Sequence, residues 1–278
     1  MPARSFRFGV SASHGGPQLL DGANQFTRAL SQAVGVPMRL WVASDYERLQ
    51  ASLTGGAVDM AWLPPLLLGR ALADQVPPVA VSQREGSVTY RSALLTRMGS
   101  RFDAPARLQG ARAAWVDPGS SSGYLFPCLH LLDAGLNPST LFTSTEFVGS
   151  FSRALAAVAH DKADLCACFV RDQAHAPGAA QQDVQSTFGW VTDRLRVIAV
   201  TSSIPPDGLV LARAVEEPIR GRIRTALLDL HHGRAGAHAL ATLLRADRLV
   251  PPDGDVLAML ERLPGRAARL GSGRADPA

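Results

Sequence analysis

The first part of the chain alternates between strand-like and helix-like patterns. Every second residue is apolar over 6–10, which predicts a strand, and the polar, glycine-containing stretch 11–16 after it has the composition of a loop. Apolar residues then recur at helical spacing over 19–33, and strand-like runs follow at 38–42 and 58–62.

Residues suited to helix ends mark two further helices in this region. Ser44 and Glu47 have the spacing of a capping box, in which each side chain satisfies a free backbone N–H, so we expect a helix from Ser44 to the glycine pair at 55–56. Pro64 and Pro65 open another helix, because proline suits the first helical turn. The order strand, helix, strand, helix, strand predicts an α/β protein with a mostly parallel sheet.

The middle of the chain repeats this alternation without repeating the sequence itself. A strand pattern at 111–116 leads into a helical pattern at 121–134. Strand, helix and strand patterns then follow at 143–148, 150–159 and 163–169.

Two long strand-like segments, 88–96 and 195–202, flank this middle block. Two such segments are what a chain needs to cross into a second lobe and return. We therefore expect a discontinuous first lobe of residues 1–95 plus 200–263 and a second lobe of residues 96–199.

The end of the chain is expected to be helical and then irregular. Helical patterns at 217–231, 235–244 and 256–263 are expected to close the first lobe. The Gly, Arg, Ala and Pro content from residue 264 onward predicts a frayed tail over 264–278.

The composition is that of a globular protein with a sizeable core. Of the 278 residues, 46% are hydrophobic and 19% are charged, which excludes a disordered, collagen-like or disulfide-stapled chain. The apolar runs are far shorter than the roughly 18 residues of a membrane span, so no membrane span is expected.

The net charge of +4, from 28 Lys and Arg against 24 Asp and Glu, raises the question of a nucleic-acid partner. Lys162 is the only lysine, and the arginines are scattered singly. Nucleic-acid binding requires a concentrated stripe of cations, so we expect no nucleic-acid partner. A genome biased toward Arg, Ala and Gly codons would give the same excess of arginine.

The cysteines and histidines predict no metal site, disulfide or cofactor. Cys128, Cys166 and Cys168 contain no CxxC pair, and the last two are expected to share one buried strand face. The seven histidines are dispersed and show no paired-ligand spacing.

The most informative segment is 115–124, in which a buried strand runs into a Gly/Ser loop and a helix begins directly after it. A helix start offers unpaired N–H groups and the positive end of the helix dipole, so an anion is favoured there. Ser120, Ser121 and Ser122 can donate to an oxyanion without carrying a charge. The plain alternative is that one serine caps the helix and the others fill a turn. The segment lacks the Gly-Lys-Ser/Thr of a Walker loop and the spacing of a nucleophile elbow.

Motifs placed in order along residues 5–230 resemble those of a known family. The most specific is Asp-Pro-Gly-Ser-Ser-Ser-Gly at 117–123, and the others lie at 43–46 with 56–62, at 90–94, at 149–164 and at 204–207. The chain thereby resembles the phosphate/phosphite/phosphonate family of substrate-binding proteins that serve ABC transporters. The resemblance implies an α/β, two-lobed, type II periplasmic-binding-protein fold, with two mixed sheets flanked by helices and a ligand cleft between the lobes.

The resemblance also implies a set of ligand-binding residues. The hydroxyls of Ser120, Ser121 and Ser122, with the Gly123 amide, would hold the phosphoryl oxygens. Tyr90 would donate a phenolic hydrogen bond from the other lobe.

Four further positions define the expected specificity. Asp207 would accept a hydrogen bond from a protonated P–OH group, and Trp62 would stand at the wall of the site. Ser150 and Arg171 occupy positions where relatives that bind aminoalkyl phosphonates have a histidine and a carboxylate. We therefore expect aminoethyl phosphonate to bind weakly, and phosphate, phosphite, a small alkyl phosphonate or a phosphate ester to bind better.

The implied function is that of a monomeric, non-catalytic, solute-binding component of an ABC-type uptake system, with the permease as its partner. The first ten residues as printed carry no secretory signal, which predicts a cytoplasmic protein; an apolar leader upstream would make it periplasmic. One alternative is a cytoplasmic oxyanion-sensing regulator of the same fold. Another is a biosynthetic enzyme of this fold, although no acid/base pair converges as general catalysis requires.

Overall fold

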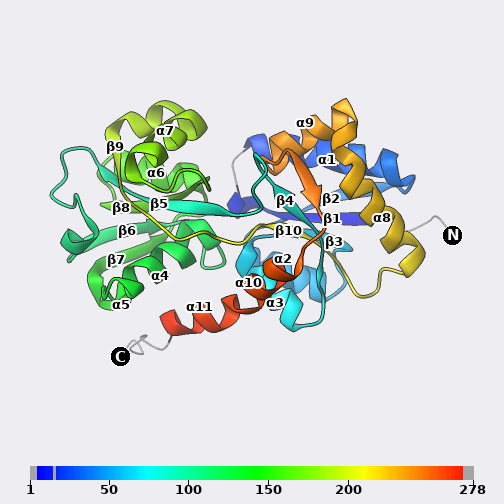
Figure 1. Cartoon of the computed structure of the whole chain (residues 1–278), viewed down its shortest axis with the longest axis horizontal. Coiled ribbons are helices and arrows are strands. Elements are labelled where there is room, and N and C mark those ends of the chain that lie inside the picture. Colours follow the sequence, from blue (N-terminus) through cyan, green and yellow to red (C-terminus); the bar gives the residue numbers. More distant parts are fainter. Residues whose placement is uncertain (1–4, 15–16, 272–278) are drawn as a thin grey trace. The chain divides into compact units, whose positions relative to one another are not determined.

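A computed structural model describes residues 5–14 and 17–271 of the chain (Figure 1). The chain divides into two compact units, each built around its own sheet. Unit 1 comprises Met1–Val88 and Pro205–Glu261, and unit 2 comprises Thr89–Ile204 and Arg262–Ala278.

The sheet of unit 1 has six strands in the order β11-β4-β10-β3-β1-β2. β1 runs parallel to β2 and β3, whereas β10 and β11 pair antiparallel to their neighbours, so the sheet is mixed. Phe8 and Phe26 pack against each other in its core, with tilted rings whose centroids are 5.0 Å apart. The strands are β1 (Phe6–Ser11), β2 (Met38–Ala43), β3 (Met60–Leu63), β4 (Pro78–Gln83), β10 (Gly208–Leu211) and β11 (Arg248–Val250). The helices are α1 (Pro17–Val34), α2 (Tyr46–Thr54), α3 (Pro65–Ala73), α8 (Glu217–Asp229), α9 (Arg234–Leu243) and α10 (Gly254–Glu261).

The start of α2 differs from the expected capping box. Asp45 is the N-cap residue, and its carboxylate accepts a 2.7 Å hydrogen bond from the Arg48 amide. The Ser44 hydroxyl donates to the same carboxylate at 2.7 Å. Ser44 therefore supports the cap instead of forming it, because a carboxylate one residue later is an equally good cap.

The sheet of unit 2 has five strands in the order β7-β6-β8-β5-β9. β6 runs parallel to β7 and β8, and β5 lies antiparallel between β8 and β9, so this sheet is also mixed. The strands are β5 (Tyr90–Arg97), β6 (Ala111–Trp115), β7 (Phe142–Phe147), β8 (Leu165–Arg171) and β9 (Leu195–Val200). The helices are α4 (Phe126–Asp133), α5 (Pro138–Leu141), α6 (Phe151–Ala159), α7 (Pro177–Phe188) and α11 (Leu263–Gly271).

Side chains on both faces of β8, the middle strand of unit 2, are buried. Cys166 and Cys168 pack with residues of α6 and α7 on one face, and Leu165 and Ala167 face the cluster that includes residues of α4. This alternation is the period of a strand, and the predicted burial of Cys166 and Cys168 on a common face is confirmed.

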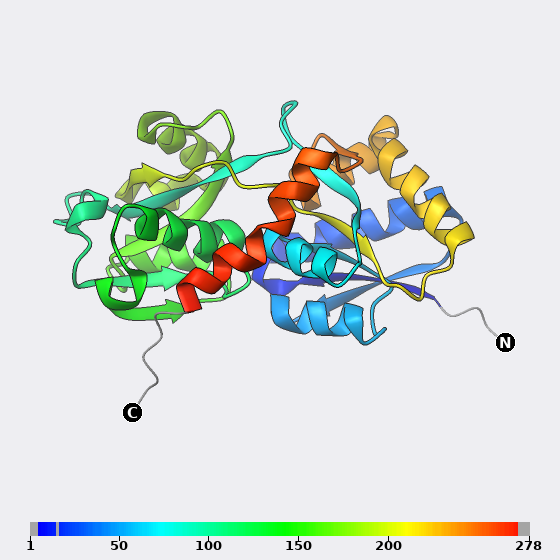
Figure 2. The same ribbon diagram turned by 60° about the horizontal axis from the view of Figure 1, so that its bottom comes forward.

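The segment expected to be a frayed tail forms α11 as far as Gly271, and residues 272–278 lie outside the described residues. Figure 2 shows α11, in red, beside α4. Arg266 and Arg269 reach Asp133 at 3.9 and 3.0 Å, and the Arg266 guanidinium lies 5.3 Å from the centre of the Phe126 ring. The tail prediction is wrong over this stretch, because these contacts fix the helix on unit 2.

The two segments expected to cross between the lobes also differ from the prediction in the unit they belong to. Residues 89–95 and 200–204 belong to unit 2, since β5 pairs along its length with β8 and β9. No helix in the described part of the chain has the combination of length and apolar character that a membrane crossing requires.

Candidate functional site

The Gly/Ser segment predicted to bind an anion joins the end of β6 to the start of α4. Its N-cap residue is Ser120, whose hydroxyl oxygen accepts the Gly123 amide at 3.1 Å. Asp117 shapes the turn before it, because its carboxylate accepts the Gly119 amide at 2.7 Å and its carbonyl accepts the Ser120 amide at 2.9 Å. We call residues Ser120–Gly123 the serine loop.

The helix that follows β6 opens with a π-helical turn, which includes the last three residues of the serine loop. Residues Ser121–Leu125 form this turn, in which the Leu125 amide donates to the Ser120 carbonyl at 3.0 Å. The expected α-helix begins only at Phe126. Such wide turns are rare and occur frequently at functional sites, because they alter where backbone groups point.

Gly123 fits this turn because it has no side chain. A Cβ atom on Gly123 would lie 2.5 Å from a methyl group of Val116 and 2.7 Å from the Ser120 hydroxyl oxygen. The Gly123 carbonyl accepts the Val116 amide at 3.2 Å, which ties the turn to the end of β6.

The three serines of the loop are buried, each at most 4% exposed. The Ser120 hydroxyl already accepts a hydrogen bond, as described above. The Ser122 hydroxyl has no hydrogen-bond partner among residues 5–14 and 17–271. Ser122 is 4% exposed and its hydroxyl oxygen keeps some contact with solvent, so this hydroxyl can donate to a ligand that reaches the loop.

Ser150 lies at the same edge of the sheet. The Val148 amide donates to the Trp115 carbonyl and the Gly149 amide to the Val116 carbonyl, both at 2.9 Å, which extends the pairing of β6 and β7. Ser150 then caps α6, and its hydroxyl oxygen accepts the Arg153 amide at 3.3 Å. Two helix starts therefore meet at the carboxyl ends of parallel strands, an arrangement that favours anions.

Tyr90 and Arg171 complete this edge. They are paired residues in the register of β5 and β8, and β5 is antiparallel, so its first residue lies where β8 ends. Tyr90 was expected from the other lobe, but it belongs to unit 2, the unit of the serine loop. The Arg171 guanidinium, half exposed, donates to Asp183 at 2.6 Å, and the Arg171 amide donates to the other carboxylate oxygen at 2.7 Å.

Trp62 and Asp207 meet each other inside unit 1. The Trp62 indole N–H donates to the Asp207 carboxylate at 2.6 Å, and the side chains of Ser82 and Arg84 donate to it at 2.7 Å each. Trp62 is 2% exposed and Asp207 is 5% exposed. Burial raises the pKa of Asp207, but Arg84, Ser82 and Trp62 together bring that pKa below its ordinary value. The carboxylate is therefore ionised and has three protein donors, and its role as a ligand acceptor stays a prediction.

Sequence reasoning missed three residues of these clusters. Ser82 and Arg84 complete the shell of Asp207, and Ser92 of β5 donates its hydroxyl hydrogen to the Ser122 carbonyl at 2.6 Å. The strand of Ser92 contains other polar residues, and its burial is known only from the fold, so no sequence signal identified it.

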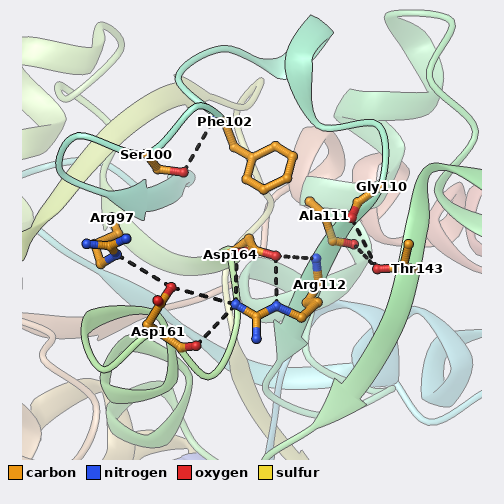
Figure 3. Close-up of polar contacts among 9 residues, drawn as sticks. All are labelled: Arg97, Ser100, Phe102, Gly110, Ala111, Arg112, Thr143, Asp161 and Asp164. Carbon is orange, nitrogen blue, oxygen red and sulfur yellow. Dashed lines mark hydrogen bonds and ion pairs between the residues drawn. The ribbon is translucent and has the colours of Figure 1, made fainter.

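A second polar cluster lies at the opposite end of β6 (Figure 3). The Arg112 guanidinium donates to both carboxylate oxygens of Asp164, at 2.9 and 3.0 Å, and to the Asp161 carbonyl at 3.1 Å. The hydrogen bond from Arg112 lowers the pKa of Asp164. This cluster pairs opposite charges and stabilises the start of the strand.

The fold resembles those of solved binding proteins. A binding-protein component of an ABC phosphonate transporter from Pseudomonas aeruginosa aligns with a TM-score of 0.82 and 20% identity, covering 99% of this chain and 90% of that chain. PhnD1 from Prochlorococcus marinus, in complex with methylphosphonate, aligns with a TM-score of 0.81 and 17% identity, covering 96% and 98%. These likenesses define the class as the type II periplasmic-binding-protein fold, and the expected architecture of two mixed sheets flanked by helices is confirmed.

Sequence comparison then gives the family. Residues 8–257 match the family described as "ABC transporter, phosphonate, periplasmic substrate-binding protein", and the chain belongs to that family. The chain is also 30% identical over 114 residues to the phosphate-import protein PhnD of Mycolicibacterium smegmatis. That match covers 39% of this chain and spans only 36% of the relative's length.

Proposed function

We propose that the chain binds a small phosphorus oxyanion through the serine loop and passes it to an ABC permease. The observation that carries the proposal is the Ser122 hydroxyl, which has no partner in the described part of the chain and lies at a helix start. A bound oxyanion would complete its hydrogen bonding. Family membership and the family's description support a periplasmic place of action.

Neutral donors suit a protein that must release its ligand. The serine loop offers hydroxyls and the positive end of a helix dipole, which stabilise negative charge without an ion pair. Lys162, the only lysine of the chain, follows α6 and lies outside the loop. Hydrogen bonds from serine hydroxyls to an oxyanion are charge-assisted only through the anion. They add no ion pair, so an anion held in this way can leave again.

The ligand we propose is phosphate, phosphite, a small alkyl phosphonate or a phosphate ester. Ser150 and Arg171 lie at the same sheet edge as the serine loop, and neither offers a negative charge to an ammonium group. An aminoethyl phosphonate would therefore bring an unmatched cation to this edge. The likeness to a methylphosphonate-bound protein and to a phosphate-import protein supports this choice.

We further propose that the protein is not an enzyme. Burial raises the pKa of all three cysteine thiols, which disfavours a nucleophilic thiolate. Among the described residues no group of three His, Cys, Asp or Glu side chains could hold a metal ion. Phosphorus NMR of each candidate ligand with the protein should show no product signal after a day.

Titration calorimetry on the full chain tests the binding proposal. The ligands are phosphate, phosphite, methylphosphonate, aminoethyl phosphonate and sulfate. We expect methylphosphonate, phosphate or phosphite to bind tightest, and Ser122→Ala to weaken that binding by about tenfold or more, because a hydrogen bond to a charged group is worth about 1.5–3 kcal/mol.

The matched control is Ser139→Ala, because Ser139 is an exposed serine of the same unit whose hydroxyl donates to Asn137. This variant should bind as the unmodified protein does. Tightest binding of aminoethyl phosphonate, or unchanged affinity in Ser122→Ala, would overturn the assignment of the site.

A further inference from the structure

Ser92 is a buried polar residue of β5, the strand between β8 and β9, and its hydroxyl donates to the backbone of the serine loop. Its hydroxyl lies 2.6 Å from the Ser122 carbonyl oxygen and 3.2 Å from the Cys168 carbonyl oxygen. We infer that Ser92 is a positioning residue that holds the serine loop in its anion-binding conformation. The inference rests on the proposed function of that loop.

The hydrogen bond from Ser92 decides which way one peptide group of the loop points. The peptide between Ser122 and Gly123 is planar, so its carbonyl and its N–H point in opposite directions. The Ser92 hydroxyl donates to the Ser122 carbonyl, and the Gly123 N–H donates to the Ser120 hydroxyl oxygen at 3.1 Å. The orientation of this peptide limits the directions that the Ser122 Cα–Cβ bond can take.

The same bond keeps a negative partial charge away from the bound anion. A carbonyl oxygen that faced an oxyanion would repel it, whereas a carbonyl turned toward the sheet does not. Two successive carbonyls are held in this way, that of Ser122 by Ser92 and that of Gly123 by the Val116 amide at 3.2 Å. The loop thus presents its hydroxyl side to a ligand and its carbonyl side to the sheet.

Ser92 can fix the loop because its own backbone is held on a rigid strand. Its amide donates to the Thr201 hydroxyl at 3.0 Å, and its carbonyl accepts the Thr201 amide at 2.9 Å. It also lies opposite Phe169 in the register with β8. A site supported from regular structure keeps its geometry more closely than one supported by loops alone.

Thr96 provides a matched control on the same strand. It lies four residues further along β5, so it faces the same side of the sheet. It is fully buried, and its hydroxyl has no hydrogen-bond partner among the residues that the structure describes. Thr96→Val therefore removes a buried hydroxyl without removing a hydrogen bond.

The experiment measures methylphosphonate affinity by calorimetry in the full-length unmodified protein and in Ser92→Ala, Ser92→Thr and Thr96→Val. We expect Ser92→Ala to weaken binding by about tenfold, the scale of one hydrogen bond. Ser92→Thr, which keeps the hydroxyl, should recover most of the affinity, and Thr96→Val should bind normally. Equal losses in Ser92→Ala and Thr96→Val, or no loss in either, would overturn the inference.

Amide hydrogen exchange without ligand separates positioning from general destabilisation, and it tests the inference even if a variant binds nothing. In Ser92→Ala the Gly123 amide should exchange about tenfold faster. The Val197 amide of β9, which donates to Gln181 at 2.9 Å, should keep its rate. Parallel acceleration of both amides would contradict a positioning role. Absence of methylphosphonate binding in the unmodified protein, with the exchange result as expected, would count against the proposed function alone.

Discussion

The two units bury polar side chains in opposite ways. In unit 1 the Asp207 carboxylate accepts hydrogen bonds from Trp62, Ser82 and Arg84, so its charge is fully matched within the protein. In unit 2 the Ser92 hydroxyl donates to the backbone of the serine loop, and the Ser122 hydroxyl remains without a partner in the described residues. A matched charged cluster stabilises a fold, whereas an unmatched neutral donor at a helix start is suited to a ligand.

The largest effect on stability should come from the matched cluster. Arg84→Met leaves the Asp207 charge buried without its cation, and breaking a buried pair in this way costs about 3 kcal/mol or more. Unfolding in urea should show this loss in the free energy of unfolding. Arg28→Met, at an exposed position of α1, is the control and should change that free energy by less than about 0.5 kcal/mol. If Arg84→Met lowered the free energy of unfolding by less than about 1 kcal/mol, the Asp207 cluster would not be the stabilising counterpart of the serine loop.

The same carboxylate predicts a pH dependence. The folded-state pKa of Asp207 lies below its ordinary value of 3.8, because Arg84, Ser82 and Trp62 outweigh the effect of burial. Its contribution to stability is therefore fully present above about pH 4 and is lost as the pH falls through the folded pKa. The urea midpoint should fall less between about pH 7 and pH 3 in Asp207→Asn than in the unmodified protein. An equal fall of the urea midpoint in both proteins would show that Arg84, Ser82 and Trp62 do not stabilise the ionised Asp207 carboxylate.

The next largest effect should fall on the serine loop. Gly123→Ala brings a methyl group within 2.5 Å of Val116 and 2.7 Å of the Ser120 hydroxyl oxygen, so the turn must shift. We expect a loss of about 1–3 kcal/mol in stability from overpacking and at least about a tenfold loss in methylphosphonate affinity. Gly178→Ala, at a helical glycine of α7 with open space around it, should leave both quantities nearly unchanged. Normal binding by Gly123→Ala would show that the turn does not form the site.

The smallest effect is expected from the exposed ion pair at the other end of β6 (Figure 3). Arg112 is 42% exposed and Asp164 is 16% exposed, so water screens much of their attraction. Arg112→Met should lower the free energy of unfolding by about 1 kcal/mol or less, and added salt should reduce the difference. A loss as large as that of Arg84→Met would show that burial does not separate the two ion pairs.

Local patterns predicted the serine loop well and its turn poorly. The order of strand, Gly/Ser loop and helix identified Ser120–Ser122 as candidate donors, because each element has a local signature. The π-helical turn at Ser121–Leu125 has no such signature and follows from the packing of Gly123 against Val116. The cap of α2 was displaced by one residue, since Ser44 and Asp45 are both good caps.

Contacts between distant residues could not be predicted from the sequence. Arg84 and Asp207 are 123 positions apart, and nothing in either segment signals the other. The crossing segment that contains Tyr90 was expected in the first lobe, but its pairing with β8 places it in unit 2. The helix α11 depends on Asp133, a residue far from it in the chain, so composition alone suggested a tail.

A crystal structure of the full chain grown with methylphosphonate is the most direct test of the serine loop as the binding site. We expect a phosphonate oxygen within hydrogen-bonding distance of the Ser122 hydroxyl, with the Ser122 carbonyl still directed toward Ser92. Methylphosphonate bound elsewhere on the protein, with the Ser122 hydroxyl still unpaired, would contradict the proposal.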